Sequence, residues 1–584
     1  MTARQRFLLL LVFFIITLII TWLWWNQREK VDLAEYAPAD ALVFLEANEL
    51  PHIVERLAST QAWRALAPAA GLEADPTQFG WLSTLAGWTS IGPAELVIYS
   101  RAQLAVVVLG FDAAEEPGAA LNIRPQAALL VETHSSDSRA QILVDKIAAD
   151  FARRAYGTPQ MSSRVEADAR FTVWTSPDGS RQIVAAQIGS LVIFGNNEAA
   201  VQSCLAVKRG ERPALIDSPQ LGEMRGRLDS LGALAFGYVS PAGTQRILEV
   251  AAIAYAGQLF INPKMQSALA TLLPQIAERF LGSAGWSSRV VDGAVEDRYF
   301  LAVSEGLTRR LSDALASLPQ PSHNASAFLP ANTYQLTRYN SADPEIAWRG
   351  LNSVVSSNLD ITLAPFAIRI LDESLKPYGI ESPRDFLQAV GPEVATARLD
   401  ESGESLVLLS PVRDPEAVRE QLRRRLSNRP RRETIGAFEL LIANDPERGA
   451  ASLVSNYLIT GEPEDVRRCL ETLAASRTLA ASEAFQKTLP HVSSNDPAGI
   501  VTFTVDRESA QTLITLIARR LQPRSHQIDS TAFGAALSRL PYSLTETRLL
   551  DTGFERKTRS AFGLFGTLAK QFEPEKNSAT NEHE

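Results

Sequence analysis

An unbroken apolar run near the start of the chain is the strongest feature of its hydrophobic pattern. Residues 7–25 read FLLLLVFFIITLIITWLWW, nineteen residues without a charge. A helix of that length rises about 28 Å, close to the hydrocarbon thickness of a bilayer. The pattern predicts a single-pass transmembrane helix, with residues 1–30 forming a short cytoplasmic tail and the anchor.

The flanks of the run bear on its processing and orientation. It ends in three tryptophans within residues 22–25 rather than at a small-residue cleavage site, which favours a retained anchor with an aromatic belt. Basic residues lie on both sides of the run, but Glu29 lowers the net positive charge of the segment after it. The charge difference therefore favours a cytoplasmic location for the N-terminal tail. The body is therefore expected outside the cytoplasm, in a periplasm or at a cell surface.

The rest of the chain alternates between strand and helix patterns. Short apolar or alternating stretches at 104–109, 127–132 and 406–409 predict strands. Apolar spacing with an aspartate near the start predicts amphipathic helices at 137–154 and 414–428.

Turn signals pair some of these strands into hairpins. Turn-forming residues separate two apolar stretches within 171–187, and again within 438–454. Helices predicted at 244–256 and 263–273 must cover the resulting antiparallel strands. The fold class expected is α+β, in which an N-terminal transmembrane helix precedes two homologous repeats, each a mostly antiparallel sheet covered by helices.

The two repeats are inferred from five pairs of short strings that recur in the same order. The pairs begin at Pro38 and Pro330, Gly92 and Gly391, Val201 and Val466, Ser218 and Ser482, and Arg289 and Arg548. Collinear landmarks of this kind indicate duplication. We predict a first repeat at 34–316, a linker at 317–326, a second repeat at 327–562, and a terminal segment with a polar tail at 563–584.

Three of these motifs resemble a known family. They are Tyr36-Ala37-Pro38-Ala39-Asp40 after the anchor, the Gly-Pro-Glu element at 391–393, and a Gly-x-x-Glu-Ala-x-Val helix start at 195–201. The chain resembles the bacterial domain-of-unknown-function family 3352 over most of residues 34–562. The resemblance implies an anchored extracytoplasmic protein without an established activity, and it transfers no functional residues.

Composition excludes several classes of protein. Among 584 residues, 57 lysines and arginines oppose 66 aspartates and glutamates, so the formal charge is −9, which argues against a basic nucleic-acid binder. Apolar residues at 46% and charged residues at 21% are typical of folded globular chains. Two cysteines are too few for a disulfide framework.

The sequence supports no catalytic, cofactor or metal site. Cys204 and Cys469 each follow a valine by three residues and precede a leucine, so we interpret both as helical core positions rather than a redox pair. None of the histidines has a metal-ligand spacing; they are His52, His134, His323, His491, His526 and His583. Nucleophile elbows, Ser-x-x-Lys and phosphate loops are absent from the sequence.

Three further patterns leave two readings open. Trp63-Arg64 and Trp348-Arg349 could stack on a ligand, but packing of the tryptophan is favoured. The arginine-rich stretch 413–432 could contact anionic lipid or an acidic partner, but Val418, Leu422 and Leu426 favour a helix with one buried face. The apolar segment 562–572 could be interfacial, but packing on the second repeat is favoured.

The leading functional hypothesis is a non-catalytic binding or scaffolding module of the cell envelope, attached to the membrane through residues 7–25. Its partner would be an envelope protein or a lipid, and no nucleic acid is expected. One alternative is a module that binds an apolar or lipid ligand between the repeats. Another is a hydrolase whose active site is assembled from distant residues. The oligomeric state does not follow from the sequence.

Overall fold

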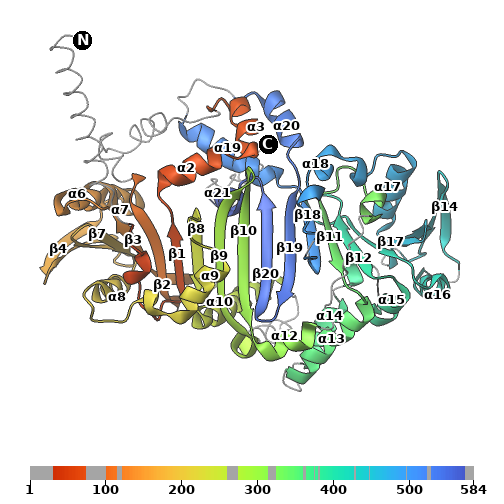
Figure 1. The fold of residues 1–584 in the computed structure, drawn as a ribbon, viewed down its shortest axis with the longest axis horizontal. Helices are drawn as coiled ribbons and strands as arrows, with labels where there is room; N and C mark the ends of the chain where they lie inside the picture. Colours follow the sequence, from red (N-terminus) through yellow and green to blue (C-terminus); the bar gives the residue numbers. More distant parts are fainter. Residues whose placement is uncertain are drawn as a thin grey trace, which may run out of the picture. The chain divides into compact units, whose positions relative to one another are not determined.

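The structure is a computed structural model (Figure 1). It describes residues 30–73, 100–114, 122–259, 274–275, 277–312, 324–358, 364–373, 375–378, 380, 382–426, 429–445, 448–494, 496–521 and 528–571. The predicted anchor at 7–25, the predicted helix at 263–273 and most of the predicted linker lie outside these residues.

The prediction of a transmembrane helix requires correction. None of the described helices is both long enough and apolar enough to cross a membrane. The longest of them, α10 (Pro241–Leu259), has 19 residues, but polar and charged side chains such as Arg246 and Glu249 interrupt its apolar stretch. Arg246 and Glu249 form an ion pair on its surface, with 2.6 Å between Nη1 and Oε2.

The described residues form 20 strands in two compact units. The smaller unit contains seven of them. Its antiparallel order is β1 (Val43–Ala47), β2 (Gln103–Ala114), β3 (Asn122–Glu132), β7 (Leu191–Gly195), β6 (Gln182–Ile188), β5 (Ala169–Thr175) and β4 (Gln160–Glu166). The strands at 104–109 and 127–132 and the hairpin at 171–187 are therefore confirmed.

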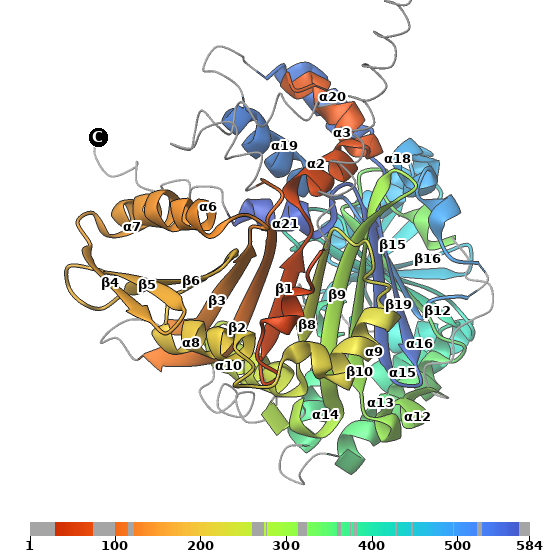
Figure 2. The same ribbon diagram turned by 60° about the vertical axis from the view of Figure 1, so that its left-hand side comes forward.

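Helices cover this small sheet because their apolar positions face it. The predicted helix at 137–154 is confirmed as α6 (Asp137–Ile142) and α7 (Ala149–Tyr156), with a π-helical turn between them. Figure 2 shows α6 and α7 together on one side of β4, β5 and β6. Ala148 and Ala152 pack with Trp174 in the core, while helix α8 (Glu198–Lys208) follows β7.

The larger unit contains the other thirteen strands in one antiparallel ladder. Their order is β8 (Ala235–Val239), β9 (Leu281–Val291), β10 (Ala294–Val303), β20 (Gly553–Ser560), β19 (Ser543–Leu550), β18 (Ile500–Thr504), β11 (Gln335–Asn340), β12 (Glu393–Arg398), β13 (Leu406–Pro411), β17 (Tyr457–Gly461), β16 (Ala450–Val454), β15 (Phe438–Ile442) and β14 (Arg431–Ile435).

Helices on this unit bury three separate apolar clusters against the sheet and each other. Besides α10 they are α2 (Leu50–Ala58), α3 (Gln61–Leu66), α9 (Pro219–Arg227), α12 (Glu305–Ser312), α13 (Pro344–Asn358), α14 (Ala364–Glu373), α15 (Pro383–Ala389), α16 (Pro415–Leu426), α17 (Pro463–Ala474), α18 (Glu483–Gln486), α19 (Arg507–Leu521), α20 (Ser530–Ser538) and α21 (Gly563–Lys570).

The expectation of one sheet for each repeat is wrong. Strand β10, from the predicted first repeat, pairs along eight residues with β20 of the second, so one ladder contains strands of both (Figure 1). An unpaired edge strand exposes a row of backbone N–H and C=O groups. Strands β10 and β20 satisfy these backbone groups for each other by pairing. The described residues after Ser218 accordingly group with the second repeat rather than with the first.

The order of elements nevertheless recurs in the two halves of the chain. The ladder β1-β2-β3-β7-β6-β5-β4 has the same order as β11-β12-β13-β17-β16-β15-β14. Isolated bridges join Pro38 to Ala214 and Pro330 to Thr478 at matching points. At the junction Arg298 lies directly opposite Lys557. These two residues are 259 residues apart, as are Asp292 and Asp551, so they occupy equivalent positions in the two repeats. A local two-fold relation therefore passes between β10 and β20.

The C-terminal apolar segment packs inside the larger unit, as favoured from its sequence. Phe562 and Ala569 are buried in the cluster that contains α19. The side chain of Asp297 on β10 accepts a hydrogen bond from Leu564 N (2.8 Å) at the start of α21. A Cβ on Gly566 would lie 3.3 Å from Ser509 O, so the glycine permits close contact between α21 and α19. Phe572 lies outside the described residues.

Candidate functional site

A predominantly apolar pocket of about 690 Å³ lies in the larger unit. Strands β11, β12, β13, β18, β19 and β20 contribute residues to it, as do helices α12, α13 and α15. Its apolar lining includes Trp348, Leu351, Leu387, Leu549 and Phe554. Ligand pockets in proteins typically measure about 300–1,000 Å³ and are mostly apolar, so this volume is adequate for a small organic molecule.

The sequence of α13 explains how one wall of the pocket forms. Asp343 caps the helix, accepting hydrogen bonds from Glu345 N (3.0 Å) and Ile346 N (3.2 Å). Trp348 and Leu351 then share a face and line the pocket. Ile346, two positions before Trp348, is 48% exposed on the outer side of the helix.

Two polar groups of the pocket lining lack hydrogen-bond partners among the described residues. Asn340 is 1% exposed and donates through Nδ2 to Ala498 O (2.9 Å), which leaves its Oδ1 buried and unpaired. The hydroxyl of the adjacent Ser341 is also buried and unpaired. Unsatisfied buried polar atoms are costly. Both oxygens are closed to solvent, so a ligand in the pocket would pair with them only after the Asn340 or Ser341 side chain turns toward it.

The charged residues of the pocket lining neutralise each other. Arg548 is 8% exposed and lies 3.1 Å from Asp496, measured from Nε to Oδ2. Its Nη2 also donates to Asp496 O (2.8 Å). Because both charges are engaged, the pocket offers mainly apolar surface.

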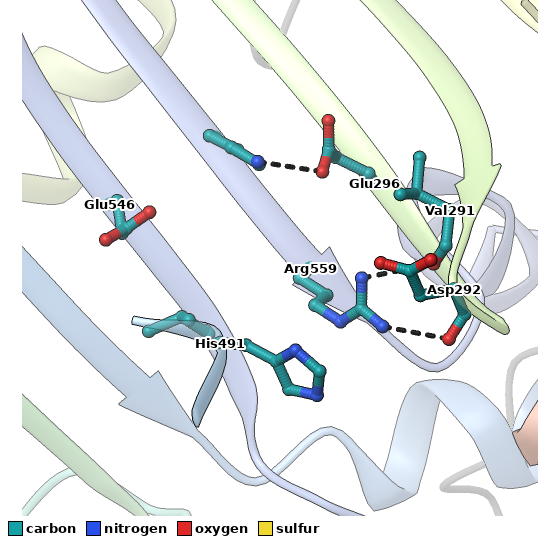
Figure 3. Close-up of a pocket in the computed structure, with 8 residues that line it drawn as sticks. Val291, Asp292, Glu296, His491, Glu546 and Arg559 are labelled. Atoms are coloured by element: carbon teal, nitrogen blue, oxygen red, sulfur yellow. Dashed lines mark hydrogen bonds and ion pairs between the residues drawn. The ribbon is translucent and has the colours of Figure 1, made fainter. Parts of the chain in front are cut away.

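A second, smaller pocket of about 170 Å³ is polar and lies where the two repeats meet (Figure 3). Asp292 and Glu296 enter it from the β9–β10 hairpin, and His491, Glu546 and Arg559 enter it from the second half of the chain. This is the convergence of titratable groups that a hydrolase with a non-local site would need.

The contacts of these groups link neighbouring strands and the turn between two of them. Arg559 donates to the carbonyl oxygens of Val291 (3.1 Å) and Asp292 (3.0 Å), which closes the β9–β10 turn onto β20 (Figure 3). Glu296 is 2% exposed and is held by Lys557 (2.9 Å) and Arg298 (2.8 Å). Burial by itself raises the pKa of Glu296, but hydrogen bonds from these two cations outweigh it and hold that pKa below its usual range.

The depressed pKa of Glu296 makes the junction acid-sensitive. The stabilisation from its carboxylate is complete above the unfolded-state pKa and is lost as the pH falls through the lower folded-state pKa. We expect Glu296→Gln to destabilise the larger unit by about 1.5–3 kcal/mol at pH 7, in the range for hydrogen bonds to charged groups, and by less at pH 3. Urea denaturation at the two pH values measures this difference.

Glu555→Gln is the matched control for the junction. Glu555 occupies the equivalent position of the second repeat and forms no ion pair among the described residues. This variant should leave the urea midpoint unchanged at both pH values. Equal destabilisation by the two variants, or a Glu296→Gln effect independent of pH, would contradict the assigned role.

The contact between Ser493 and Glu546 beside the polar pocket is also structural. Ser493 Oγ donates to Glu546 Oε2 (2.8 Å), but the same carboxylate accepts Ser493 N (2.9 Å) and lies 3.4 Å from Arg548. A carboxylate engaged in this way holds the backbone of the loop in place. Ser493 is not among the residues that line the pocket.

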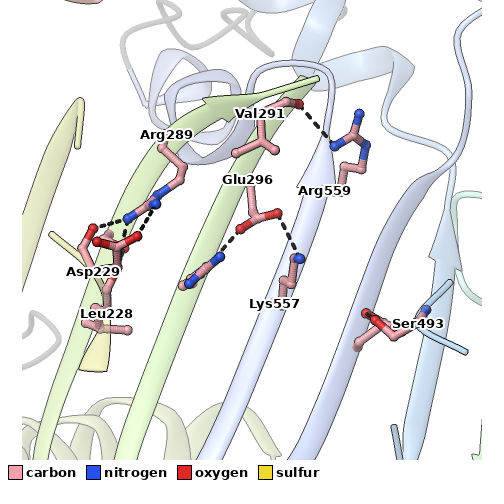
Figure 4. Close-up of polar contacts among 11 residues, drawn as sticks. Leu228, Asp229, Arg289, Val291, Glu296, Ser493, Lys557 and Arg559 are labelled. Atoms are coloured by element: carbon pink, nitrogen blue, oxygen red, sulfur yellow. Dashed lines mark hydrogen bonds and ion pairs between the residues drawn. The ribbon is translucent and has the colours of Figure 1, made fainter. Parts of the chain in front are cut away.

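The repeated Arg-x-x-Asp strings position loops. Arg289 on β9 lies 2.5 Å from Asp229 in the loop before β8 (Figure 4). Arg548 on β19 binds Asp496 in the loop before β18. In each repeat the arginine thus holds the loop that leads into the neighbouring strand.

Both cysteines are core residues, as interpreted from the sequence. Cys204 on α8 and Cys469 on α17 are free and fully buried, at matching places in the two repeats. Burial raises the pKa of each thiol to about 12, so neither forms a thiolate near neutral pH.

The histidines are not brought together. His491 lines the polar pocket; partial burial and then the Arg559 charge lower its pKa, so the imidazole is neutral at pH 7. His134 bonds to Gln103 Oε1 (2.7 Å) in the smaller unit. His323, His526 and His583 lie outside the described residues. Among the residues that are described, no three His, Cys, Asp or Glu side chains form a potential metal site.

The two Trp-Arg pairs have different surroundings. Trp63 on α3 is 6% exposed, packs in the α19–α20 cluster and donates through Nε1 to Glu73 O (3.3 Å). Trp348 lies on α13, the first helix after its strand rather than the second, and lines the apolar pocket. Packing is therefore confirmed for Trp63, whereas Trp348 contributes to the candidate site.

The arginine-rich helix α16 has the buried face expected from its spacing. Val418, Leu422 and Leu426 are buried in the core. On the opposite side, Glu420 binds Arg423 (3.0 Å) and Arg424 (3.2 Å). The charges are thus part of a solvated helix face.

Sequence reasoning missed most of the apolar pocket. Among its lining residues, Trp348 and Arg548 had been singled out, because both belong to repeated strings. Asn340 is the last residue of strand β11 and Ser341 is the first residue after it, where polar residues are ordinary. These two residues stand out only in the folded structure, where they are buried in the lining of a pocket without hydrogen-bond partners for Asn340 Oδ1 and Ser341 Oγ.

Comparison with known proteins identified no relative. No protein-family model matches the chain, and neither a curated protein nor a solved structure matches it. Membership of the domain-of-unknown-function family 3352 therefore stays a prediction.

Proposed function

We propose that this protein is a non-catalytic binding module that holds a predominantly apolar ligand in the pocket beneath α13. The observation that carries the proposal is the pocket's volume of about 690 Å³ together with its apolar lining. Burying apolar surface contributes about 25 cal/mol per Å², so such a ligand needs few polar contacts for useful affinity.

The unpaired polar atoms narrow the ligand class. Asn340 Oδ1 accepts only, and Ser341 Oγ can accept or donate, so the matching ligand carries a hydroxyl or N–H group on an apolar body. Asp496 and Arg548, the two charged residues of the described lining, neutralise each other, which disfavours an anionic or cationic headgroup. A long-chain alcohol has the required chemistry.

Displacement of a fluorescent apolar probe tests the pocket. N-phenyl-1-naphthylamine should bind the full-length protein with enhanced emission, and 1-dodecanol should displace it. Leu351→Trp fills the pocket from α13 and should weaken probe binding by tenfold or more. Ile346→Trp, on the exposed side of the same helix, should bind like the unmodified protein.

The polar part of the proposal is tested by comparing two competitors. Ser341→Ala removes a hydroxyl that has no partner, so the fold should be unaffected. We expect about fivefold weaker displacement by 1-dodecanol and unchanged displacement by dodecane, since a neutral hydrogen bond contributes about 1 kcal/mol. Probe binding that is absent, or equal in Leu351→Trp, would refute the proposed function.

A further inference from the structure

Strand β4 is an open edge of the sheet in the smaller unit. Within the described residues it pairs with β5 alone. All seven of its residues are exposed, including Met161 at 66% and Val165 at 73%. At the end of β4, where the chain turns into β5, the Glu166 carbonyl accepts a hydrogen bond from Arg209 Nη2 (3.0 Å). An edge of this kind is a template for pairing with another strand.

The two faces of β4 differ in chemistry. Arg164 lies over the ring of Phe171 (4.7 Å to the centroid) and pairs with Glu198 on α8 (2.6 Å), so the polar face is engaged within the unit. Met161, Ser163 and Val165 share the other face, which carries no charge. That face is the one on which Trp174 lies opposite Met161.

The equivalent edge of the second repeat is protected by charge. Strand β14 occupies the same place in the repeat ladder as β4. It places Arg431 and Glu433 on one face and Arg432 on the other. Arg432 pairs with Glu439 (3.0 Å), and Glu433 with Arg467 (2.9 Å). Charged side chains on an edge strand commonly prevent it from pairing with another chain. The apolar face of β4 has no such charged side chain.

The sequence of β4 is complementary to itself in an antiparallel register. When two copies pair about Ser163, Met161 of each lies opposite Val165 of the other, and Ser163 lies opposite itself. On the second face, Gln160 then lies opposite Glu166 and Ser162 opposite Arg164. Every cross-strand pair is apolar with apolar or polar with polar, with no like charges opposed.

From this complementarity we infer that β4 is a homodimerisation edge, at which a second copy of the chain adds antiparallel to the strand around a two-fold axis at Ser163. The interface is isologous, as in most homodimers. Seven paired residues bury little surface, so the dimer is weak and depends on protein concentration.

Sedimentation of the full-length protein tests the dimer. The unmodified chain should sediment as a concentration-dependent dimer. Val165→Lys places a charge against Met161 twice in each interface and should raise the dissociation constant by tenfold or more. Thr434→Lys on β14 is the control and should dimerise normally; because both sites are exposed or nearly so, circular dichroism should show intact folds.

Cysteine trapping tests the register. Oxidation of Ser163→Cys should give a disulfide-linked dimer, because the two Cβ atoms at the axis would lie within bonding reach, while Ser162→Cys should not. The native cysteines are buried and should not interfere. A chain that stays monomeric at all concentrations, or a dimer that survives Val165→Lys without trapping at Ser163, would overturn the inference, as would pairing of β4 with a different protein.

Discussion

Arg338→Met should destabilise the larger unit by about 3–5 kcal/mol, the cost of removing one partner of a buried ion pair. Arg338 on β11 is 1% exposed and is the largest fully buried side chain of the described residues. Its Nε lies 2.8 Å from Glu393 on β12, which is 4% exposed. The variant leaves the Glu393 carboxylate in the core without this cation. Amide hydrogen exchange of β11, β12 and β18 measures the loss locally.

The double variant Arg338→Met/Glu393→Leu separates a lost attraction from a stranded charge. Replacing a whole buried ion pair by apolar side chains is often neutral or stabilising. We therefore expect exchange protection in the double variant to recover well above that of Arg338→Met. If the double variant were as unprotected as the single one, desolvation of Glu393 would not be the cause of the loss.

Phe485→Ala should cost about 3–5 kcal/mol, because it opens a cavity in a core that has no solvent access. Phe485 on α18 is fully buried. Its ring centroid lies 4.8 Å from that of Phe503 on β18 and 5.8 Å from that of Tyr542, in tilted and edge-on arrangements. Removing the ring deletes both contacts, and urea denaturation followed by near-ultraviolet circular dichroism measures the effect.

Phe485→Leu provides the comparison for this cavity. Leucine keeps most of the apolar volume and should cost less than half as much as alanine. Tyr542 holds its own position through a hydrogen bond from its hydroxyl to Thr333 O (2.7 Å), so collapse of the ring into the cavity should be limited. Equal losses for leucine and alanine would show that aromatic contact, rather than volume, dominates.

Local elements were predictable because their causes are local. Val418, Leu422 and Leu426 follow helical spacing, and they form the buried face of α16. Turn residues at 176–179 separate β5 from β6 as expected. The burial of Cys204 and Cys469 likewise follows from their neighbours in sequence, since valine and leucine share their helical face.

The Gly-Pro-Glu landmark shows where local reasoning stops. Gly391-Pro392-Glu393 was recognised as a repeated string, but its chemistry depends on Arg338, 55 residues earlier. Nothing near either residue indicates that an arginine will be buried on the adjacent strand. The same holds for Asp297, which caps α21 from a strand 267 residues earlier.

The sequence by itself determined the helices at 137–154 and 414–428, the hairpins and the core character of the cysteines, because these depend on residues close together in the chain. The duplication was visible as short strings that recur in the same order. Only the tertiary structure decided that β10 joins β20, that the strands and α13 enclose an apolar pocket with two unpaired polar atoms, and that β4 is left open. Strand pairing satisfies backbone groups that every sequence carries, so the choice of partner leaves little trace in the side chains.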